Sequence, residues 1–227
     1  MKIYYDGNAI KKYKDLDFVE GFTSNTSYAS QSDNKDYRSY IEDFVKEANG
    51  RSCSFQGWSD DDEEILRQAK EITSFGPNVF VKIPIIKLNG NNNLPVLNQV
   101  LDLGLKVNVT AIHTIEQIDL VLQLLPRENP MIVSVFAGGI TDAGVDPKPI
   151  MKHAVNIFRS DKNIEILWAG CQTNLHVVEA RECGCQIITI PDAVMNKLDR
   201  MKNSLLETSL LKVKKFMEDG ISIPKKF

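Results

Sequence analysis

The stretch Asp61–Ile85, DDEEILRQAKEITSFGPNVFVKIPI, decides the fold class, because a helix pattern and a strand pattern follow each other within it. The apolar residues of its first half recur at helical spacing: Ile65, Leu66, Ala69 and Ile72. This spacing predicts an amphipathic helix over Asp61–Ser74, and the acidic residues at its start are favourable at a helix N-terminus. The second half, Val79–Ile85, is a short apolar run typical of a buried strand. Strands and helices in alternation are the units of an α/β fold.

The same alternation extends over the rest of the chain. We predict eight strands: Lys2–Asp6, Gly21–Asn25, Ser52–Trp58, Val79–Ile85, Lys106–Ile112, Met131–Gly138, Glu165–Gly170 and Gln186–Pro191. Further helices are predicted at Leu94–Leu103, Ile115–Leu125, Pro149–Arg159, His176–Cys183 and Ala193–Met201. Right-handed strand–helix repeats of this number close into a barrel. We therefore predict one α/β domain over residues 1–227, a single (β/α)8 TIM barrel with an extra C-terminal helix at Ser204–Glu218.

An open, doubly wound sheet is the alternative fold. The chain lacks the glycine-rich phosphate-binding turn that opens many such sheets, which favours the closed barrel. The polar stretch Ser27–Asp36, rich in Ser, Asn and Asp, predicts a mobile loop after the second strand.

Composition and charge exclude several classes of protein. Of the 227 residues, 43% are hydrophobic and 25% charged, which is ordinary for a globular protein with a sizeable core. The formal net charge of −3 gives no electrostatic indication of a polyanionic partner, so no nucleic-acid partner is expected. The start MKIYYDGNAI lacks the features of a signal peptide, and no apolar run approaches the ~20 residues of a membrane span. We expect a cytoplasmic protein without membrane contact.

The four cysteines are too sparse for a disulfide framework. Cys183 and Cys185 resemble half of a metal site, but no second ligand pair with suitable spacing is present. We therefore expect no metal site and no cofactor.

Lys82 is the strongest candidate for a catalytic residue. Its ammonium would lie within the apolar run Val79–Ile85, so it must be paired or have its pKa lowered by desolvation. An uncharged lysine can condense with a ketone, and the iminium that results permits cleavage of the neighbouring carbon–carbon bond. The alternative is a lysine whose amine reaches solvent from the strand end.

Other polar residues stand near the ends of predicted strands, where the active sites of α/β barrels gather. They are Asp6, Asn25, Gln56, Thr110 and Ser134. Asp6 is a candidate for proton transfer at the hydroxyl group beside the cleaved bond. Each of these residues could instead bond loop backbone groups, and it is their convergence on one rim that favours a site.

Several segments resemble the transaldolase and fructose-6-phosphate aldolase family over nearly the entire chain. The residues that carry the resemblance are Met1–Asp6, Thr23–Ser27, Val81–Pro84 (VKIP), Asn108–Thr110 (NVT), Val133–Phe136 and Ile188–Pro191. The resemblance implies that Lys82 is a Schiff-base lysine and Asp6 the acid/base group. It further implies that Asn25 binds substrate hydroxyls, and that Gln56 and Thr110 hold a catalytic water.

The pocket residues implied by the resemblance differ between its two subtypes. Ser134 and Phe136 would line the pocket, and Phe136 is similar to the transaldolases, whereas Gln56 is similar to the aldolases. Trp168, near the end of the seventh strand, is a candidate to stack on a sugar face, with a packed core position as the alternative.

Departures from the family pattern gather where its members bind phosphate. Gly139 stands where the family has an arginine, Gly170 where it has a serine, and Gln172 where it has a basic residue. Such cations form charge-assisted hydrogen bonds to phosphate, each contributing about 1.5–3 kcal/mol. We therefore expect a small-molecule sugar substrate other than an ordinary phosphosugar, with Gln172 in its binding site.

Three functions are consistent with these residues. The first is transfer of a dihydroxyacetone unit from a ketose to an aldehyde acceptor. The second is an aldolase reaction that releases dihydroxyacetone, and the third is a catalytically silent sugar-binding barrel. Small members of the family form pentamers and decamers through the C-terminal helix, so a homo-oligomer built through Ser204–Glu218 is expected.

Overall fold

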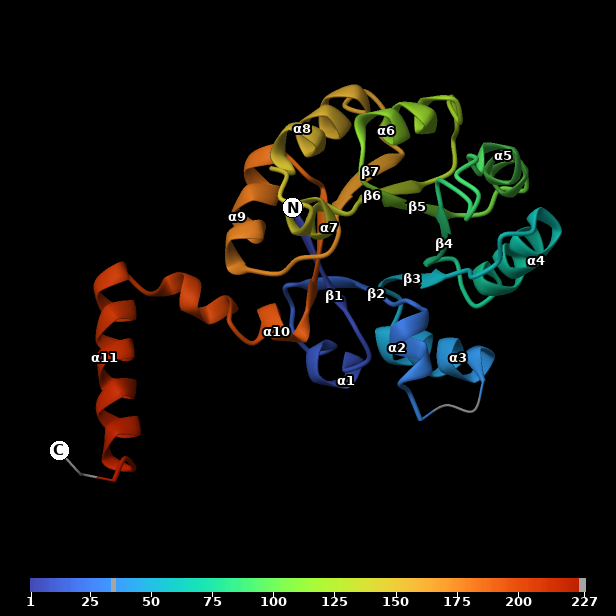
Figure 1. Ribbon diagram of the computed structural model, residues 1–227. Helices are drawn as coiled ribbons and strands as arrows, with labels where there is room; N and C mark the ends of the chain where they lie inside the picture. The colour runs from blue at the N-terminus through green and yellow to red at the C-terminus, as the bar shows by residue number, and fades with distance from the viewer. Residues whose placement is uncertain (34–35, 225–227) are drawn as a thin grey trace. The chain divides into compact units, whose positions relative to one another are not determined.

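The computed structural model describes residues 1–33 and 36–224. Eight parallel strands form a closed barrel in chain order, with β8 paired to β1 (Figure 1). They are β1 (Lys2–Asp6), β2 (Val19–Thr23), β3 (Ser52–Gln56), β4 (Val79–Pro84), β5 (Val107–Ile112), β6 (Met131–Val135), β7 (Ile164–Trp168) and β8 (Ile187–Pro191). The predicted (β/α)8 barrel is confirmed, and the open-sheet alternative is wrong.

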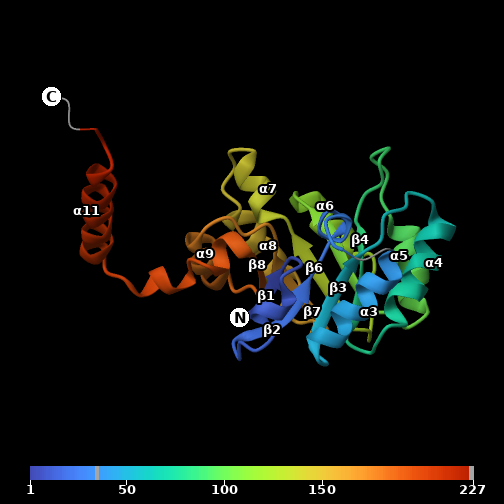
Figure 2. The same ribbon diagram turned by 90° about the horizontal axis from the view of Figure 1, so that it is seen from below.

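Helices occupy the connections between the strands. They are α1 (Ile10–Tyr13), α2 (Thr26–Ser30), α3 (Tyr37–Ala48), α4 (Asp62–Thr73), α5 (Leu94–Asp102), α6 (Ile115–Leu122), α7 (Ala137–Asp142), α8 (Lys148–Ile157), α9 (Asn174–Cys183) and α10 (Asp192–Met195). Sequential neighbours lie side by side on the outside of the barrel, as α4 and α5 and again α8 and α9 show in both views (Figures 1 and 2).

The connection after β2 differs from the prediction. Thr26–Ser30, which overlaps the start of the predicted loop Ser27–Asp36, forms the short helix α2, because the Asn25 side chain accepts a hydrogen bond from the Tyr28 amide at 3.1 Å and caps it. Tyr37–Ala48, for which no helix is predicted, forms α3 and buries Tyr40, Ile41, Phe44 and Ala48 on one face. Residues 34 and 35 of the predicted mobile loop lie outside the described residues.

Strand β6 is shorter than predicted. It ends at Val135 and not at Gly138, because the chain turns into α7 at Ala137. Gly138 then approaches Gly170 so closely that a Cβ atom at position 138 would lie 2.0 Å from the Gly170 carbonyl oxygen. Only glycine fits this contact, and neither residue is part of a strand.

The barrel interior is layered along the strands. An apolar layer is formed by Tyr4, Phe80, Ile132, Leu167, Ala169 and Ile187. Successive side chains of a strand alternate between the two faces, so the residue two positions further along shares the inward face. On β1, β4 and β6 these inward residues are Asp6, Lys82 and Ser134. The strand geometry thus directs them into one end of the barrel, above the apolar layer.

Asn196–Phe227 forms a second compact unit. It contains a 3-10 helix, η1 (Leu198–Lys202), and the long helix α11 (Leu205–Ile221), which confirms the extra C-terminal helix. Ser204 and Glu207 form a capping box at its start. Among the described residues, no helix has the length and apolar character needed to cross a bilayer.

Candidate active site

Lys82 lies on β4, level with Gln56 of β3 and Asn108 of β5. The residue is 7% exposed. Its Nζ donates a hydrogen bond to the Ser24 carbonyl oxygen at 3.1 Å. Desolvation by burial lowers the pKa of Lys82, and the negative charge of Asp6 opposes this shift. A backbone carbonyl compensates only part of the lost hydration, so the amine is easier to deprotonate than an exposed lysine.

Asp6 lies at the end of β1 and receives hydrogen bonds on both carboxylate oxygens. Thr23 Oγ1 donates to Oδ1 at 2.6 Å, and Tyr28 Oη donates to Oδ2 at 3.4 Å. Burial raises the pKa of Asp6, whereas the Lys82 charge and these two hydroxyl groups lower it. The site thus contains an amine with a lowered pKa and a carboxyl group with a raised pKa, each of which influences the other.

Thr23 also connects Asp6 to β8. Its hydroxyl group lies 2.5 Å from the Thr189 hydroxyl, and since it donates to Asp6, Thr189 donates to it. Both threonines are buried. Thr23, Thr189 and Tyr28 are not among the predicted site residues. The inward parity of Thr23 on β2 and Thr189 on β8 is the signal that could have identified the two threonines.

Gln56 and Thr110 flank Lys82 on the neighbouring strands. Gln56 Nε2 donates to the Gly57 carbonyl oxygen at 2.9 Å and to the Lys82 carbonyl oxygen at 3.2 Å. Thr110 Oγ1 is buried and has no hydrogen-bond partner among the described residues. Buried hydroxyl groups are rarely left unpaired, so this atom is suited to bind a water or a substrate oxygen. The next residue, Ala111, has a φ of 60°, a conformation that is strained for a side chain other than glycine.

Ser134 belongs to a buried polar network around Asn108. Ser134 Oγ donates to Asn108 Oδ1 at 2.7 Å, and Asn108 Nδ2 donates to Ser54 Oγ at 3.2 Å. Asn108 is 0% exposed, on the strand face that Thr110 also occupies. Asn108 is not among the predicted site residues and belongs only to the NVT motif. Its spacing of two residues from Thr110 is the signal that Asn108 shares the inward face of β5.

The remaining predicted pocket residues lie in different environments. Asn25 uses its carbonyl oxygen to cap α2. Phe136 packs on the apolar layer of the barrel, with its ring centroid 5.5 Å from that of His113.

The predicted position of Trp168 in the sugar-binding site is corrected by the structure. Its indole is 0% exposed and lies 5.4 Å from the ring of His176 on α9, because residue 168 has the outward parity of β7. It cannot stack on a sugar at the barrel end.

The region of Gly139, Gly170 and Gln172 contains a carboxylate where a phosphate site requires cations. Gln172 Nε2 donates to Asp142 Oδ2 at 2.8 Å. A Cβ atom at Gly139 would lie 2.7 Å from His113 Nε2, so an imidazole occupies the space beside this glycine. Gly170 has a φ of +70°, which favours glycine. The described side chains therefore provide hydrogen bonds here and no lysine or arginine clamp.

Metal ligands do not gather anywhere in the described part of the chain, where no group of three or more His, Cys, Asp or Glu side chains could hold an ion. The chemistry that the site itself supports is that of the Lys82 amine. A primary amine beside a carboxyl group that can take up and release a proton can form and resolve an iminium with a ketone.

One protein family and several known proteins are similar to the chain. The family model of transaldolase/fructose-6-phosphate aldolase matches residues 4–223. A probable transaldolase of Bdellovibrio bacteriovorus is 28% identical over 230 residues, which cover 100% of both chains. A probable transaldolase of Oceanobacillus iheyensis is 29% identical, covering 96% of this chain and 98% of the relative. The structure of 3-hexulose-6-phosphate synthase from Salmonella typhimurium superposes with a TM-score of 0.59 at 11% identity, over 86% of this chain and 91% of that one, a likeness of fold.

Proposed function

The chain belongs to the transaldolase/fructose-6-phosphate aldolase family, and we propose that it transfers a dihydroxyacetone unit from a ketose to an aldehyde through a Schiff base on Lys82. The observation that carries the proposal is the buried Lys82 amine, whose pKa is lowered by desolvation in the neighbourhood of a carboxyl group with a raised pKa. The family relationship makes the chain an enzyme of the transferase and aldolase type.

The first step is attack of the neutral Lys82 amine on the ketose carbonyl carbon. A carbon–nitrogen bond forms, and the carbonyl oxygen leaves as water once it has been protonated. The cationic iminium that remains draws electrons from the neighbouring carbon–carbon bond. Gln56 and Thr110 are the candidates to hold the departing water, and the unpartnered Thr110 hydroxyl supports this role.

The second step breaks the carbon–carbon bond. The Asp6 carboxylate accepts the proton of the hydroxyl group on the far carbon, that carbon leaves as an aldehyde, and the bond electrons remain on Lys82 as an enamine. An acceptor aldehyde then adds to the enamine with return of the proton from Asp6, and hydrolysis releases the new ketose. If water instead protonates and releases the enamine, the products are dihydroxyacetone and an aldehyde, which is the lyase alternative. Product analysis with and without an acceptor aldehyde separates the two reactions.

A catalytically silent sugar-binding barrel is a weaker candidate. A buried, desolvated lysine is unfavourable for stability unless a function or a partner compensates. The continuous hydroxyl chain from Thr189 through Thr23 to Asp6 likewise supports a proton-transfer role.

The proposed substrate is an unphosphorylated or otherwise modified ketose. The support is the Gln172–Asp142 hydrogen bond and the imidazole of His113 beside Gly139, in the region where the family binds phosphate. A carboxylate in that position repels a phosphate dianion. We expect kcat/KM for fructose to equal or exceed that for fructose 6-phosphate, measured by release or transfer of the three-carbon unit. A preference of about a hundredfold or more for the phosphate ester would contradict the proposed substrate and leave the Lys82 chemistry intact.

Tyr28→Phe should shift the pH dependence of turnover. The Tyr28 hydroxyl lowers the pKa of Asp6 by donating to Oδ2, so its loss raises a pKa that burial has already raised. Asp6 must be ionised to accept the hydroxyl proton, so less of the active form is present at a given acidic pH. We expect the acidic limb of kcat/KM to move to higher pH, with Lys82 and Thr23 still facing Asp6.

Tyr13→Phe is the matched control, because the Tyr13 hydroxyl donates to Asp192 and not to Asp6. Its acidic limb should coincide with that of the wild type. If the acidic limb of kcat/KM in Tyr28→Phe stayed in place or moved to lower pH, the Tyr28 hydroxyl would not be lowering the pKa of Asp6.

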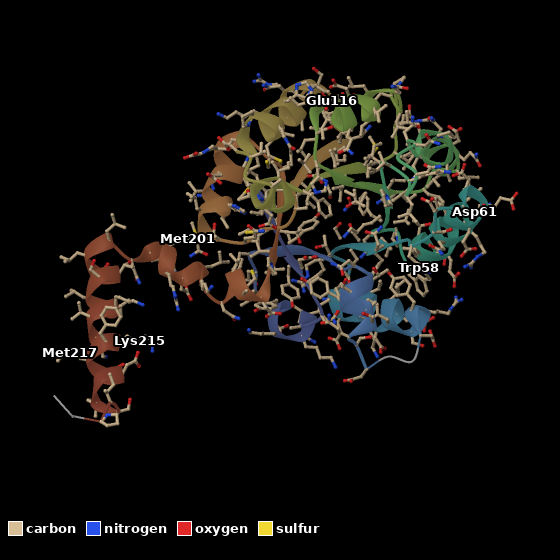
Figure 3. The ribbon with its side chains drawn as sticks, viewed as in Figure 1. Trp58, Asp61, Glu116, Met201, Lys215 and Met217 are labelled. Carbon is tan, nitrogen blue, oxygen red and sulfur yellow. The ribbon has the colours of Figure 1, made fainter. Side chains whose placement is uncertain are left out.

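We also propose that the chain acts in the cytoplasm as a homo-oligomer, a pentamer or decamer. The four cysteines are buried free thiols, which accords with a reducing compartment. The C-terminal unit exposes a series of large apolar side chains: Leu205, Leu206, Leu210, Leu211, Val213, Phe216, Met217, Ile221 and Ile223. Figure 3 marks Met217 on α11. Sedimentation equilibrium should give a mass several times 25.6 kDa, and a monomer would refute the assembly.

A further inference from the structure

A cavity of about 500 Å³ lies between α2, α3 and the residues that follow β3. Its wall is formed by the rings of Tyr37, Tyr40 and Trp58, which we call the aromatic subsite. The rest of the lining is formed by Thr26, Ala29, Ser30, Ser32 and Asp36. The volume falls within the range of about 300–1,000 Å³ that is usual for small-molecule sites, and the combination of aromatic walls with a few polar groups is also typical.

The aromatic subsite is hydrogen-bonded to the catalytic segments. Tyr37 Oη donates to the Gln56 carbonyl oxygen at 2.9 Å. The Tyr40 hydroxyl bonds the hydroxyl of Ser24, and the carbonyl oxygen of the same serine accepts from Lys82 Nζ at 3.1 Å. The cavity wall is therefore two bonded steps from the reacting amine. The cavity and the Lys82 amine thus share Ser24 as a common neighbour.

Trp58 offers a large aromatic surface in a fixed position. The residue is 54% exposed, and Figure 3 shows it beside α3 and α4. Its ring meets the Tyr37 ring edge-on, with centroids 4.7 Å apart at 86°. Its backbone amide donates to Gln68 Oε1 at 2.9 Å. An exposed indole that packs edge-on against Tyr37 favours stacking with a planar ring of a ligand.

The charge of the lining limits the occupant. Asp36 is the one charged side chain among the described lining residues, and its carboxylate is already engaged at the start of α3, where it accepts from the Ser39 amide at 2.8 Å. No described lysine or arginine lines the cavity. Among the described residues, the lining therefore offers an anionic ligand no cation to offset the cost of its desolvation.

We propose that the aromatic subsite binds the end of the substrate remote from the carbonyl group, and that this end carries an uncharged planar ring, aryl or heteroaryl. The inference rests on the proposed function for the identity of the reacting end. It explains how the far end of a substrate without a phosphate can be held: in place of phosphate binding in the region of Gly139 and Gln172, its ring stacks on Trp58.

The test compares two aldehyde acceptors with dihydroxyacetone as donor, phenylacetaldehyde with a ring and propanal without one. The quantity is the ratio of their kcat/KM values. We expect Trp58→Ala to lower this ratio about tenfold, and Trp58→Phe to restore most of it. The control is Phe18→Ala, which removes a ring that is 48% exposed just before β2, at the opposite end of the barrel, and should keep the wild-type ratio. An unchanged ratio in Trp58→Ala, or an equal loss in Phe18→Ala, overturns the proposal.

A binding measurement separates failure of the subsite from failure of the proposed function. The probe is 2-phenylethanol, which cannot form an iminium, titrated by NMR into Lys82→Met and into Lys82→Met with Trp58→Ala. We expect binding to the first and at least about fivefold weaker binding to the second. If neither aldehyde reacts with the wild type but binding depends on Trp58, the subsite stands and the proposed function fails. Binding that is equal in the two variants overturns the subsite.

Discussion

Lys82→Met is expected to lower kcat by about four orders of magnitude or more, because no other described lysine shares the buried position that makes this amine nucleophilic. Methionine matches the length and apolar character of the lysine stem, so packing against the barrel interior is retained. The fold should be at least as stable as the wild type, since a desolvated amine has been removed. Turnover with saturating ketose and thermal unfolding test both expectations.

Lys87→Met is the matched control for a lysine of the same β4–α5 region. Its ammonium pairs with Asp62 at 2.6 Å and is absent from the network around Asp6. We expect its kcat to remain within about threefold of the wild type, because the described contact of the Lys87 ammonium is with Asp62 and not with Asp6 or Lys82. Residual activity above about a tenth in Lys82→Met would mean that another group carries the reaction.

Asp6→Asn is expected to lower kcat by about 10²- to 10⁴-fold, the contribution of a positioned acid/base group. The amide keeps the size of the carboxyl group and cannot accept the hydroxyl proton when the carbon–carbon bond breaks. Iminium formation on Lys82 does not require that proton transfer, so reductive trapping should persist while cleavage fails. Trapping yield and cleavage rate, measured on the same preparation, separate the two steps.

Asp61→Asn is a suitable control for this exchange of a carboxylate for an amide. Asp61 caps α4 by accepting from the Glu64 amide at 2.9 Å, and asparagine caps helices equally well. Its activity should match the wild type. If Asp6→Asn cleaved the ketose at a rate within about fivefold of the wild type, Asp6 would not be the acid/base group.

The strands were predictable because buried parallel strands leave continuous apolar runs in the sequence. Val79–Ile85 and Lys106–Ile112 agree with β4 and β5 to within a residue at each end. Tyr37–Ala48 was missed, although its buried residues Tyr40, Ile41, Phe44 and Ala48 recur at helical spacing. Gly138 was assigned to strand β6, because the sequence does not reveal that Gly138 contacts Gly170. Only a glycine at position 138 allows this contact.

The candidate site was predictable to the extent that it depends on strand parity. Lys82, Asp6, Thr110 and Ser134 share the inward face, and their positions near the ends of predicted strands were the signal that placed them on one rim. Trp168 has the opposite parity, and its burial agrees with the packed core position that was the alternative to sugar stacking. Tyr28 could not be predicted, because its hydroxyl reaches Asp6 from a short helix whose direction is set by the Asn25 cap and not by a strand.

The proposed reaction depends on the Lys82 amine, which must form a covalent bond with a ketone within the barrel. The most direct measurement is incubation of the wild type with fructose, reduction with sodium borohydride, and peptide mapping by mass spectrometry. We predict a stable adduct on the peptide that contains Lys82, with no such adduct in Lys82→Met. An adduct on a different lysine in the wild type, or an equal yield from Lys82→Met, would contradict the account.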